Sequence, residues 1–368
     1  MAAFMPQPLA PRLIIDLDAL ARNYTVLTSV SGVEVAPVIK ADGYGLGATK
    51  IAIRLWAEGA RRFFVARLGE GERLRRGLGP TRPAEIFVLD GFTAHSGERF
   101  TKSKLTPVIN TLTQISDAKA FAKTSGDLLT VALHVDTGMN RQGLTLEETD
   151  AVSRDPEGLR GLRTEVIMSH LGSANASNHP RNAIQLRRFQ SVLSLFPGIR
   201  RSLSASAGTF LGDDFQFDLV RPGVSLFGGG PEEVPDDRLE AVATLLAPVL
   251  DIREIPAGEF VGYGSDLKMA RPARVAIVAA GYADGLLRAA RGKAFGWIHG
   301  KPCPMLLVNM DLIALEIGDM PVRVGDWVEL MGPNAKIDLL AAAAGTVAHE
   351  CLVRMSSRAK RVYVGFRG

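Results

Sequence analysis

The sequence predicts a (β/α)8 barrel followed by a mainly β C-terminal domain. The chain has 368 residues, a length that suggests two domains. In the first two thirds, eight short apolar runs are each followed by a polar or glycine-containing turn, and several connecting segments have helical periodicity. After about residue 238 the pattern changes to alternating apolar and polar residues separated by Gly, Pro and Asp.

Strands that alternate with helices pair in parallel, and eight such units favour a closed barrel over an open sheet. The expected strands are 33–40, 63–67, 85–89, 105–109, 130–136, 164–169, 202–206 and 217–221. The expected helical connectors include 48–58, 69–77, 112–122 and 184–195.

In the last third, strands are expected at 249–255, 274–279, 305–317 and 327–330, and a single helix at 339–344. Turn residues at 228–231 and 235–237 are typical of a domain boundary. We therefore expect a barrel domain at 1–238 and a β domain at 239–368.

Composition excludes several classes of protein. Lys and Arg number 43 against 39 Asp and Glu, a net charge of +4, and the basic pairs carry no aromatic platform, so nucleic-acid binding is not expected. Two cysteines form no disulfide framework, and the six histidines show no metal-binding spacing. No apolar run approaches the ~18 residues of a membrane span, and no signal peptide is visible, so we expect a cytoplasmic protein.

Lys40 closes the first expected strand and precedes a glycine-rich turn. In a barrel, catalytic residues stand at the C-terminal ends of the strands. Partial burial there would lower the pKa of Lys40, and a neutral amine can attack a carbonyl as a Schiff-base former. The alternative is an ordinary surface lysine at a turn.

Ser206 and Gly223 follow the seventh and eighth expected strands, where barrels often bind phosphate. A serine hydroxyl can donate a hydrogen bond, and a glycine lets backbone N–H groups approach an anion closely. Each residue alone is compatible with a simple turn, but the pair predicts a phosphate site.

A second interpretation of the glycine-rich turn is a dinucleotide-binding fingerprint, since Gly43, Gly45 and Ala48 have the required spacing. That fingerprint expects an acidic residue at the end of the second strand. Arg67 stands there instead, which disfavours a nicotinamide enzyme.

The chain resembles the alanine racemase family, a group of pyridoxal-phosphate enzymes, over nearly its whole length. The motifs that carry the resemblance occur in family order at 38–45, 135–139, 168–170, 220–223, 262–264, 281–285 and 310–311. The family fold is an eight-stranded α/β barrel with a C-terminal β domain, as the sequence pattern also predicts.

The resemblance implies a role for each residue at the strand ends. Lys40 would hold pyridoxal phosphate covalently and act as one catalytic base, and Tyr263 of the β domain would act as the other. The implied cofactor contacts are Tyr44, Ser206, Gly223 and Val224 at the phosphate, Arg221 at the pyridine nitrogen and His170 against the ring. The implied substrate contacts are Arg141 and the backbone N–H of Met310 at the carboxylate, with Tyr282 narrowing the entrance.

Racemisation removes a proton from one face of Cα and returns one to the other face, which two bases can do without moving the substrate. Both Lys40 and Tyr263 have ordinary pKa values near 10, so their neighbours must lower them. Arg221 at the pyridine nitrogen limits the electron sink of the cofactor. In the family, the tyrosine reaches the barrel of the partner subunit, which implies a head-to-tail homodimer with shared active sites and a role in supplying D-alanine for peptidoglycan.

Three positions depart from the commoner family pattern. His134 stands where many members have a carbamylated lysine that orients the arginine at Arg141. Ala205 replaces a common Asn, and Ser357 falls where a phosphate-binding Tyr often stands. These departures leave both bases in place but leave a broader racemase, for example for serine, as an alternative. A pyridoxal-phosphate decarboxylase and a non-enzymatic cofactor carrier are the remaining alternatives; Arg221 argues against the first, and the β domain with Tyr263 against the second.

Overall fold

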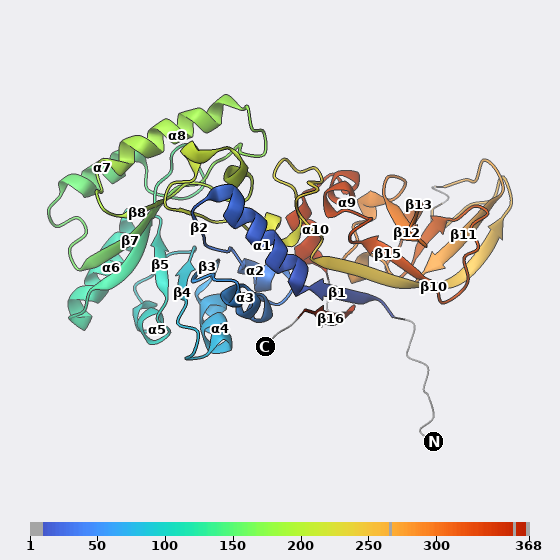
Figure 1. Cartoon of the computed structure of the whole chain (residues 1–368), viewed down its shortest axis with the longest axis horizontal. Coiled ribbons are helices and arrows are strands. Elements are labelled where there is room, and N and C mark those ends of the chain that lie inside the picture. Colours follow the sequence, from blue (N-terminus) through green and yellow to red (C-terminus); the bar gives the residue numbers. More distant parts are fainter. Residues whose placement is uncertain (1–9, 265–266, 356–357, 366–368) are drawn as a thin grey trace, which may run out of the picture. The chain divides into compact units, whose positions relative to one another are not determined.

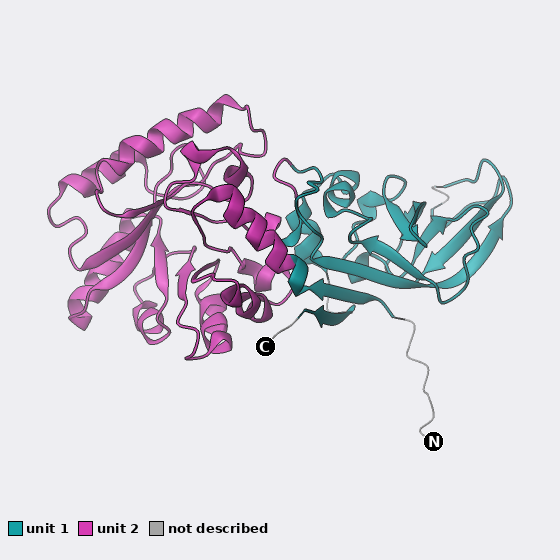
Figure 2. Ribbon diagram, viewed as in Figure 1, with its two compact units in different colours: residues 1–19, 227–229, 233–366 teal, residues 20–226, 230–232, 367–368 magenta. Residues whose placement is uncertain are grey.

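The computed structural model describes residues 10–264, 267–355 and 358–365, which form two compact units (Figures 1 and 2). One unit consists of residues 20–226 and 230–232. The other consists of the described parts of 1–19, 227–229 and 233–366.

The first unit is the predicted barrel. Its strands are β2 (Glu34–Val35), β3 (Arg62–Val65), β4 (Glu85–Val88), β5 (Thr106–Ile109), β6 (Leu129–His134), β7 (Leu162–Met168), β8 (Arg200–Ser202) and β9 (Leu219–Val220). Strands β3 to β8 form one parallel sheet in sequence order, and β2 pairs in parallel with β9. Single parallel bridges join Val38 to Phe64 and Ala205 to Arg221, so the eight strands form a closed ring. This confirms the fold that the sequence predicts.

Helices follow most strands of the barrel (Figure 1). They are α2 (Lys40–Tyr44), α3 (Ala48–Ala57), α4 (Leu68–Leu78), α5 (Gly97–Lys102), α6 (Leu112–Ser125), α7 (Leu146–Arg154) and α8 (Pro180–Leu193), and α1 (Leu17–Ser31) precedes the first barrel strand. The last two connections contain only short 3-10 turns, η1 (Ala207–Phe210), η2 (Asp213–Phe215) and η3 (Val224–Phe227). All four expected helical connectors overlap a helix.

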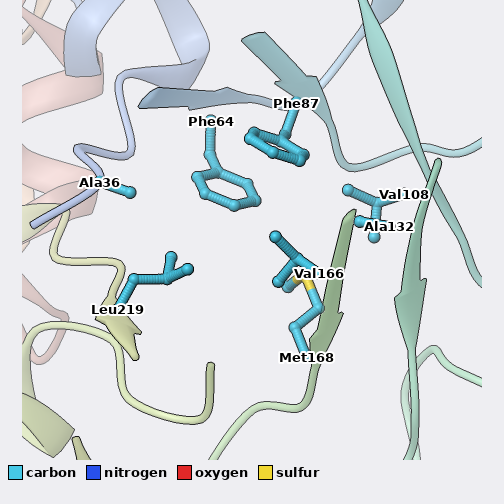
Figure 3. Close-up of a cluster of buried hydrophobic side chains, with 8 residues drawn as sticks. All are labelled: Ala36, Phe64, Phe87, Val108, Ala132, Val166, Met168 and Leu219. Atoms are coloured by element: carbon cyan, nitrogen blue, oxygen red, sulfur yellow. The ribbon is translucent and has the colours of Figure 1, made fainter. Parts of the chain in front are cut away.

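The centre of the barrel is filled by side chains from six of its strands and by Ala36 just after β2, which point toward one another in Figure 3. They are Ala36, Phe64, Phe87, Val108, Ala132, Val166, Met168 and Leu219. The rings of Phe64 and Phe87 stack with their centroids 4.7 Å apart, while alanines on other strands leave room for them. The barrel is thus packed solid below its mouth, and only the strand ends are available for binding.

The second unit is a mainly antiparallel β domain, also as predicted. Its strands are β1 (Arg12–Asp16), β10 (Ala243–Ile255), β11 (Ala273–Val278), β12 (Phe295–Ile298), β13 (Lys301–Val308), β14 (Ile313–Glu316), β15 (Trp327–Met331) and β16 (Lys360–Val364). They form one sheet in the order β11-β14-β13-β12-β15-β10-β1-β16, and β11 also pairs with β10. Every pairing is antiparallel except that of β1 with β16.

Two details of this unit correct the sequence prediction. The unit has a second helix, α10 (Ala348–Arg354), besides α9 (Ile337–Ala344), because Ala348, Cys351 and Leu352 bury one face at helical spacing. The expected strand 305–317 is also broken, because residues 309–312 form a turn between β13 and β14. Among the described helices, none is long and apolar enough to cross a membrane.

Candidate active site

Lys40 is the first residue of α2 and follows the first barrel strand, β2, with the buried Ile39 directly before it. Part of the side chain is accessible at the barrel mouth, but the surrounding protein removes much of the hydration of the amine. This burial lowers the pKa of Lys40, and the positive charge of Arg141 lowers it further, against the opposite effect of Glu70 and Asp90. The pKa of Lys40 is therefore lowered, as expected for a lysine whose amine attacks a carbonyl.

The chain after Lys40 turns in the left-handed sense. Four residues of the α2 segment have positive φ, between 52° and 65°: Ala41, Asp42, Gly43 and Tyr44. For residues other than glycine this conformation costs roughly 1–2 kcal/mol each. Backbone strain of this kind persists only where the surrounding structure holds it.

Hydrogen bonds and packing hold this left-handed turn. The N–H of Ala41 donates to Oε1 of Glu70 at 3.0 Å, and Oδ1 of Asp42 accepts from the N–H of Ala48 at 3.0 Å. A Cβ atom on Gly43 would lie 2.5 Å from Cδ1 of Ile51, so this position has no room for a side chain. The turn directs Lys40 and Tyr44 into one region of the barrel.

Tyr44, Ser206 and Gly223 meet at the loops after β8 and β9. A Cβ atom on Gly223 would lie 2.1 Å from the Tyr44 hydroxyl, which shows how closely the backbone approaches the phenol. The N–H groups of Gly223 and Ser225 both donate to Oγ of Ser206, at 2.9 and 3.3 Å. Val224, between them, begins the turn η3.

This cradle, formed by Tyr44, Ser206, Gly223, Val224 and Ser225, is rich in hydrogen-bond donors. Burial raises the pKa of Tyr44, so its hydroxyl remains protonated and can donate. Oγ of Ser225 is buried and has no hydrogen-bond partner among the described residues. Buried polar groups are almost always paired, so an orphaned hydroxyl beside these donors indicates a missing acceptor. The donor set fits a phosphate group.

Arg221 lies buried at the end of β9. Its guanidinium donates to Oγ of Ser202, to the carbonyl of Ser169 at 2.6 Å and to the carbonyl of Leu203 at 3.5 Å. These partners are neutral, and burial lowers the pKa of Arg221 to about 9. Among the described residues, no carboxylate forms an ion pair with this guanidinium, which is held by neutral groups.

Burial and four titratable neighbours affect His170. Burial lowers the pKa of His170 well below its usual value, and Arg221, Arg141, His134 and Lys40 lower it further. His170 is therefore neutral at physiological pH. His170, Lys40, Arg141 and Arg221 each follow a barrel strand, namely β7, β2, β6 and β9, so all four lie on the side of the barrel where the strands end.

His134 has a defined protonation state. The amide NH2 of Asn110 donates to the carbonyls of Leu89 (2.9 Å) and Val108 (2.8 Å), so Oδ1 of Asn110 must be the acceptor toward Nδ1 of His134 at 2.8 Å. The proton of the neutral ring therefore sits on Nδ1. Burial, with Arg221 and Arg141 as further causes, lowers the pKa of His134 to about 4.

The three predicted residues of the β domain share one pocket of about 810 Å³ within their own unit. Tyr263, between two glycines of positive φ, is 83% exposed, and Met310 is 53% exposed on the turn between β13 and β14. Tyr282 lies on η4 (Tyr282–Asp284), and Arg288 also lines the pocket. The N–H of Tyr282 donates to the carbonyl of Asn309 at 2.9 Å.

The structure thus groups the predicted residues into two sets. One set lies in the barrel unit and consists of Lys40, Tyr44, Arg141, His170, Ser206, Arg221, Gly223 and Val224. The other lies in the β unit and consists of Tyr263, Tyr282 and Met310. The departure at Ser357 lies outside the described residues.

Sequence reasoning missed Asn110, Ser225 and Ser202. Asn110 follows strand β5, and a polar side chain directly after an apolar run was the available signal. Ser225 comes two residues after Gly223, within the same loop. Ser202 lies inside a strand, and nothing in the sequence shows that its hydroxyl accepts from Arg221.

Fold and site together define a two-domain enzyme of the barrel-plus-β class with a lysine and a phosphate cradle at the barrel mouth. The sequence model of the alanine racemase N-terminal domain matches residues 15–231, and that of the C-terminal domain matches residues 242–363. The chain belongs to the alanine racemase family.

Individual relatives match over almost their whole length. An alanine racemase of Rhizobium meliloti is 40% identical over 96% of this chain and 97% of the relative. A catabolic alanine racemase of Agrobacterium fabrum is 38% identical over 96% of this chain and 92% of the relative. The crystal structure of alanine racemase from Bartonella henselae with covalently bound pyridoxal phosphate has a TM-score of 0.91 at 34% identity, covering 97% of this chain and 100% of that one.

Proposed function

We propose that this protein is a pyridoxal-phosphate-dependent alanine racemase, an isomerase that interconverts L- and D-alanine. The observation that carries the proposal is the pairing of Lys40, whose amine pKa is lowered, with a donor-rich cradle at the two loops where barrels bind phosphate. The family relatives, whose names state alanine racemase activity, support the same reaction.

The residues present suit the cofactor. Tyr44, Ser206 and the N–H groups at Gly223 and Val224 would bind its phosphate, and Arg221 would face its pyridine nitrogen. When bound, pyridoxal phosphate withdraws electrons from an attached amino acid and so makes the proton on Cα acidic. A cation at Arg221 disfavours a proton on the pyridine nitrogen, which favours return of the proton to Cα over transamination or decarboxylation.

Lys40 and Tyr263 would hold and move the proton. Nζ of Lys40 serves one face of Cα, and Oη of Tyr263 serves the other. Arg141 and the backbone N–H of Met310 would bind the substrate carboxylate, His170 would lie against the cofactor, and Tyr282 would narrow the entrance. Of these two carboxylate-binding groups, Arg141 is charged and the N–H of Met310 is not, so Arg141 would contribute more to the electrostatic part of substrate binding.

The exposure of Tyr263 supports a shared active site. A catalytic base must be held within hydrogen-bond reach of the proton that it moves, and a side chain that is 83% exposed has few surroundings to hold it. We infer that the β domain of one subunit completes the barrel site of a second in a head-to-tail homodimer, where Tyr263 becomes enclosed.

A mixing experiment tests this arrangement. The variants Lys40→Ala and Tyr263→Phe are each expected to be inactive alone. After subunit exchange, each mixed dimer would contain one site with both bases intact, giving about a quarter of the wild-type activity from an equal mixture. No recovery, despite demonstrated exchange, would show that the two bases come from the same chain.

Formation of D-alanine from L-alanine by the purified protein tests the reaction. A panel including serine distinguishes a strict alanine racemase from a broader one, and release of carbon dioxide would reveal a decarboxylase instead. Full activity of Lys40→Ala would refute the assignment.

We propose a cytoplasmic role in supplying D-alanine for peptidoglycan. Two buried cysteines, Cys303 and Cys351, remain free thiols, as is usual in a reducing compartment. Rescue of a bacterial strain that needs added D-alanine tests the biosynthetic role. Failure to rescue, with active protein present, would favour the breakdown role named for the Agrobacterium fabrum relative.

A further inference from the structure

Arg358 connects two loops of the β domain. Its Nη1 lies 2.7 Å from Oδ1 of Asp311, and its Nε lies 3.5 Å from Oδ1 of Asp284. Asp311 belongs to the turn that carries Met310, and Asp284 ends the 3-10 turn that begins at Tyr282. One guanidinium thus forms ion pairs with both loops.

The backbone joins the same two loops. The N–H groups of Tyr282 and Ala283 donate to the carbonyls of Asn309 and Met310, at 2.9 and 3.0 Å. A Cβ atom on Gly281 would lie 2.2 Å from the carbonyl oxygen of Asn309, so the loops are packed as closely as backbones allow. Among the described residues, the N–H of Met310 donates to no protein group and remains available to a ligand.

The contact between the two loops depends on Arg358 because Asp284 is a buried carboxylate that pairs with it. The carboxylate is only 1% exposed, and its Oδ2 accepts from the N–H of Gly281 at 2.9 Å. Among the residues that the structure describes, its buried Oδ1 accepts no hydrogen bond, and it forms an ion pair with Arg358. Burial raises the pKa of Asp284, Arg358 lowers it, and the neighbouring charge of Asp311 raises it. Without Arg358, two carboxylates would repel each other across the contact between the loops.

We propose that Arg358 is a positioning residue for substrate binding: by pairing with Asp284 and Asp311 it fixes the turn that presents the N–H of Met310. Arg358 does not line the pocket itself and acts through the two loops. The inference rests on the proposed function, because it assigns the Met310 N–H to the substrate carboxylate.

The consequence appears in substrate affinity more than in turnover. A misplaced N–H weakens carboxylate binding in the ground state and the transition state alike, which raises KM and leaves kcat nearly unchanged. We expect Arg358→Ala to raise KM for alanine about tenfold while kcat changes less than about threefold.

Acetate provides a second readout, since it presents a carboxylate without the reacting Cα. Its inhibition constant should rise by the same factor as KM. Arg358→Lys keeps one charge near the carboxylates but loses the planar guanidinium that reaches both, so its values should lie between those of wild type and Arg358→Ala.

The chain offers a matched control in Arg354. Its side chain has nearly the same exposure, 47% against 48%, and pairs with Glu350 on helix α10 at 3.5 Å. Arg354→Ala should leave both KM and the acetate constant at wild-type values. An equal effect of Arg354→Ala, unchanged constants in Arg358→Ala, or a fall in kcat alone would overturn the proposal.

If Arg358→Ala does not fold, Asp311→Asn decides the question, because it removes the 2.7 Å ion pair at an exposed side chain. A raised acetate constant supports the proposal and an unchanged one contradicts it. Wild-type protein that racemises no alanine would refute the proposed function separately, before any variant is compared.

Discussion

The barrel half and the β-domain half of the candidate site differ in how completely each is assembled. In the barrel, Arg221 is buried and hydrogen-bonded, and Gly223 packs directly against Tyr44. In the β domain, Tyr263 and Met310 extend from loops with most of their surfaces exposed. The half proposed to hold the cofactor is therefore preorganised within one chain, whereas the proposed second base still needs an enclosing surface. Substitution of buried residues in the barrel half should therefore lower stability, whereas substitution of exposed residues in the β half should lower activity with little effect on stability.

Tyr263→Phe should give the largest effect on activity and almost none on stability. Loss of a catalytic base typically lowers the rate by about 10²–10⁴-fold. Because the side chain is exposed, the free energy of unfolding should change by less than about 0.5 kcal/mol. Racemisation rates and denaturant unfolding of the same preparation check both statements, and a large stability loss would erase the contrast between the halves.

Arg221→Met should show the opposite balance, with a loss of about 2–4 kcal/mol of unfolding free energy. The substitution removes the donor from the Ser202 hydroxyl and the Ser169 carbonyl, which stay buried. Urea unfolding of the cofactor-free protein measures this loss without reference to catalysis. If Arg221→Met is as stable as wild type, the hydrogen bonds of Arg221 to Ser202 and Ser169 do not stabilise the barrel, contrary to this prediction.

Gly223→Ala should weaken cofactor binding by about tenfold to a hundredfold, because the added Cβ would displace the Tyr44 hydroxyl that lies 2.1 Å away. Absorbance titration of the cofactor-free protein with pyridoxal phosphate measures the affinity. Gly198→Ala is the control for the glycine substitution, since a Cβ there meets no atom within 4 Å, although its positive φ of 78° carries a local cost.

His134 should give an effect that appears only as the pH falls, a loss of about 2–3 kcal/mol of unfolding free energy between pH 7 and pH 4.5. Its pKa falls from 6.5 to about 4 on folding, so its contribution is present above pH 6.5 and is lost as the pH falls toward 4. Between those values the unfolded state binds the proton and the native state does not. His134→Gln should therefore lose less stability than wild type between pH 7 and pH 4.5, and parallel losses in both proteins would contradict the assignment.

The sequence predicted features set by local pattern and by position in the barrel. Eight apolar runs and their turns were sufficient for the strand count, and Lys40 followed from its place at a strand end. Met310 was recognised by its motif, yet its surroundings were predicted as strand. Residues 309–312 turn because β13 and β14 pair antiparallel on either side of them, a contact that local periodicity does not encode.

Other features depend on partners distant in the chain. Strand β1 pairs with β10 and β16, more than 200 residues away, and no periodicity within 12–16 indicates that. Asn110 and Ser225 have ordinary sequence surroundings, and their significance comes from the groups that they contact in the folded chain, such as His134 for Asn110 and Ser206 for Ser225.

The left-handed turn after Lys40 has a consequence for chemical synthesis. A mirror-image amino acid prefers the backbone angles that an L-residue is forced to adopt at positive φ. A semisynthetic protein with the D-enantiomer of alanine at position 41, where φ is 52°, should consequently unfold at a higher temperature than the natural chain. This position, which L-residues occupy at a cost, would then suit a residue of the opposite hand better than the one encoded.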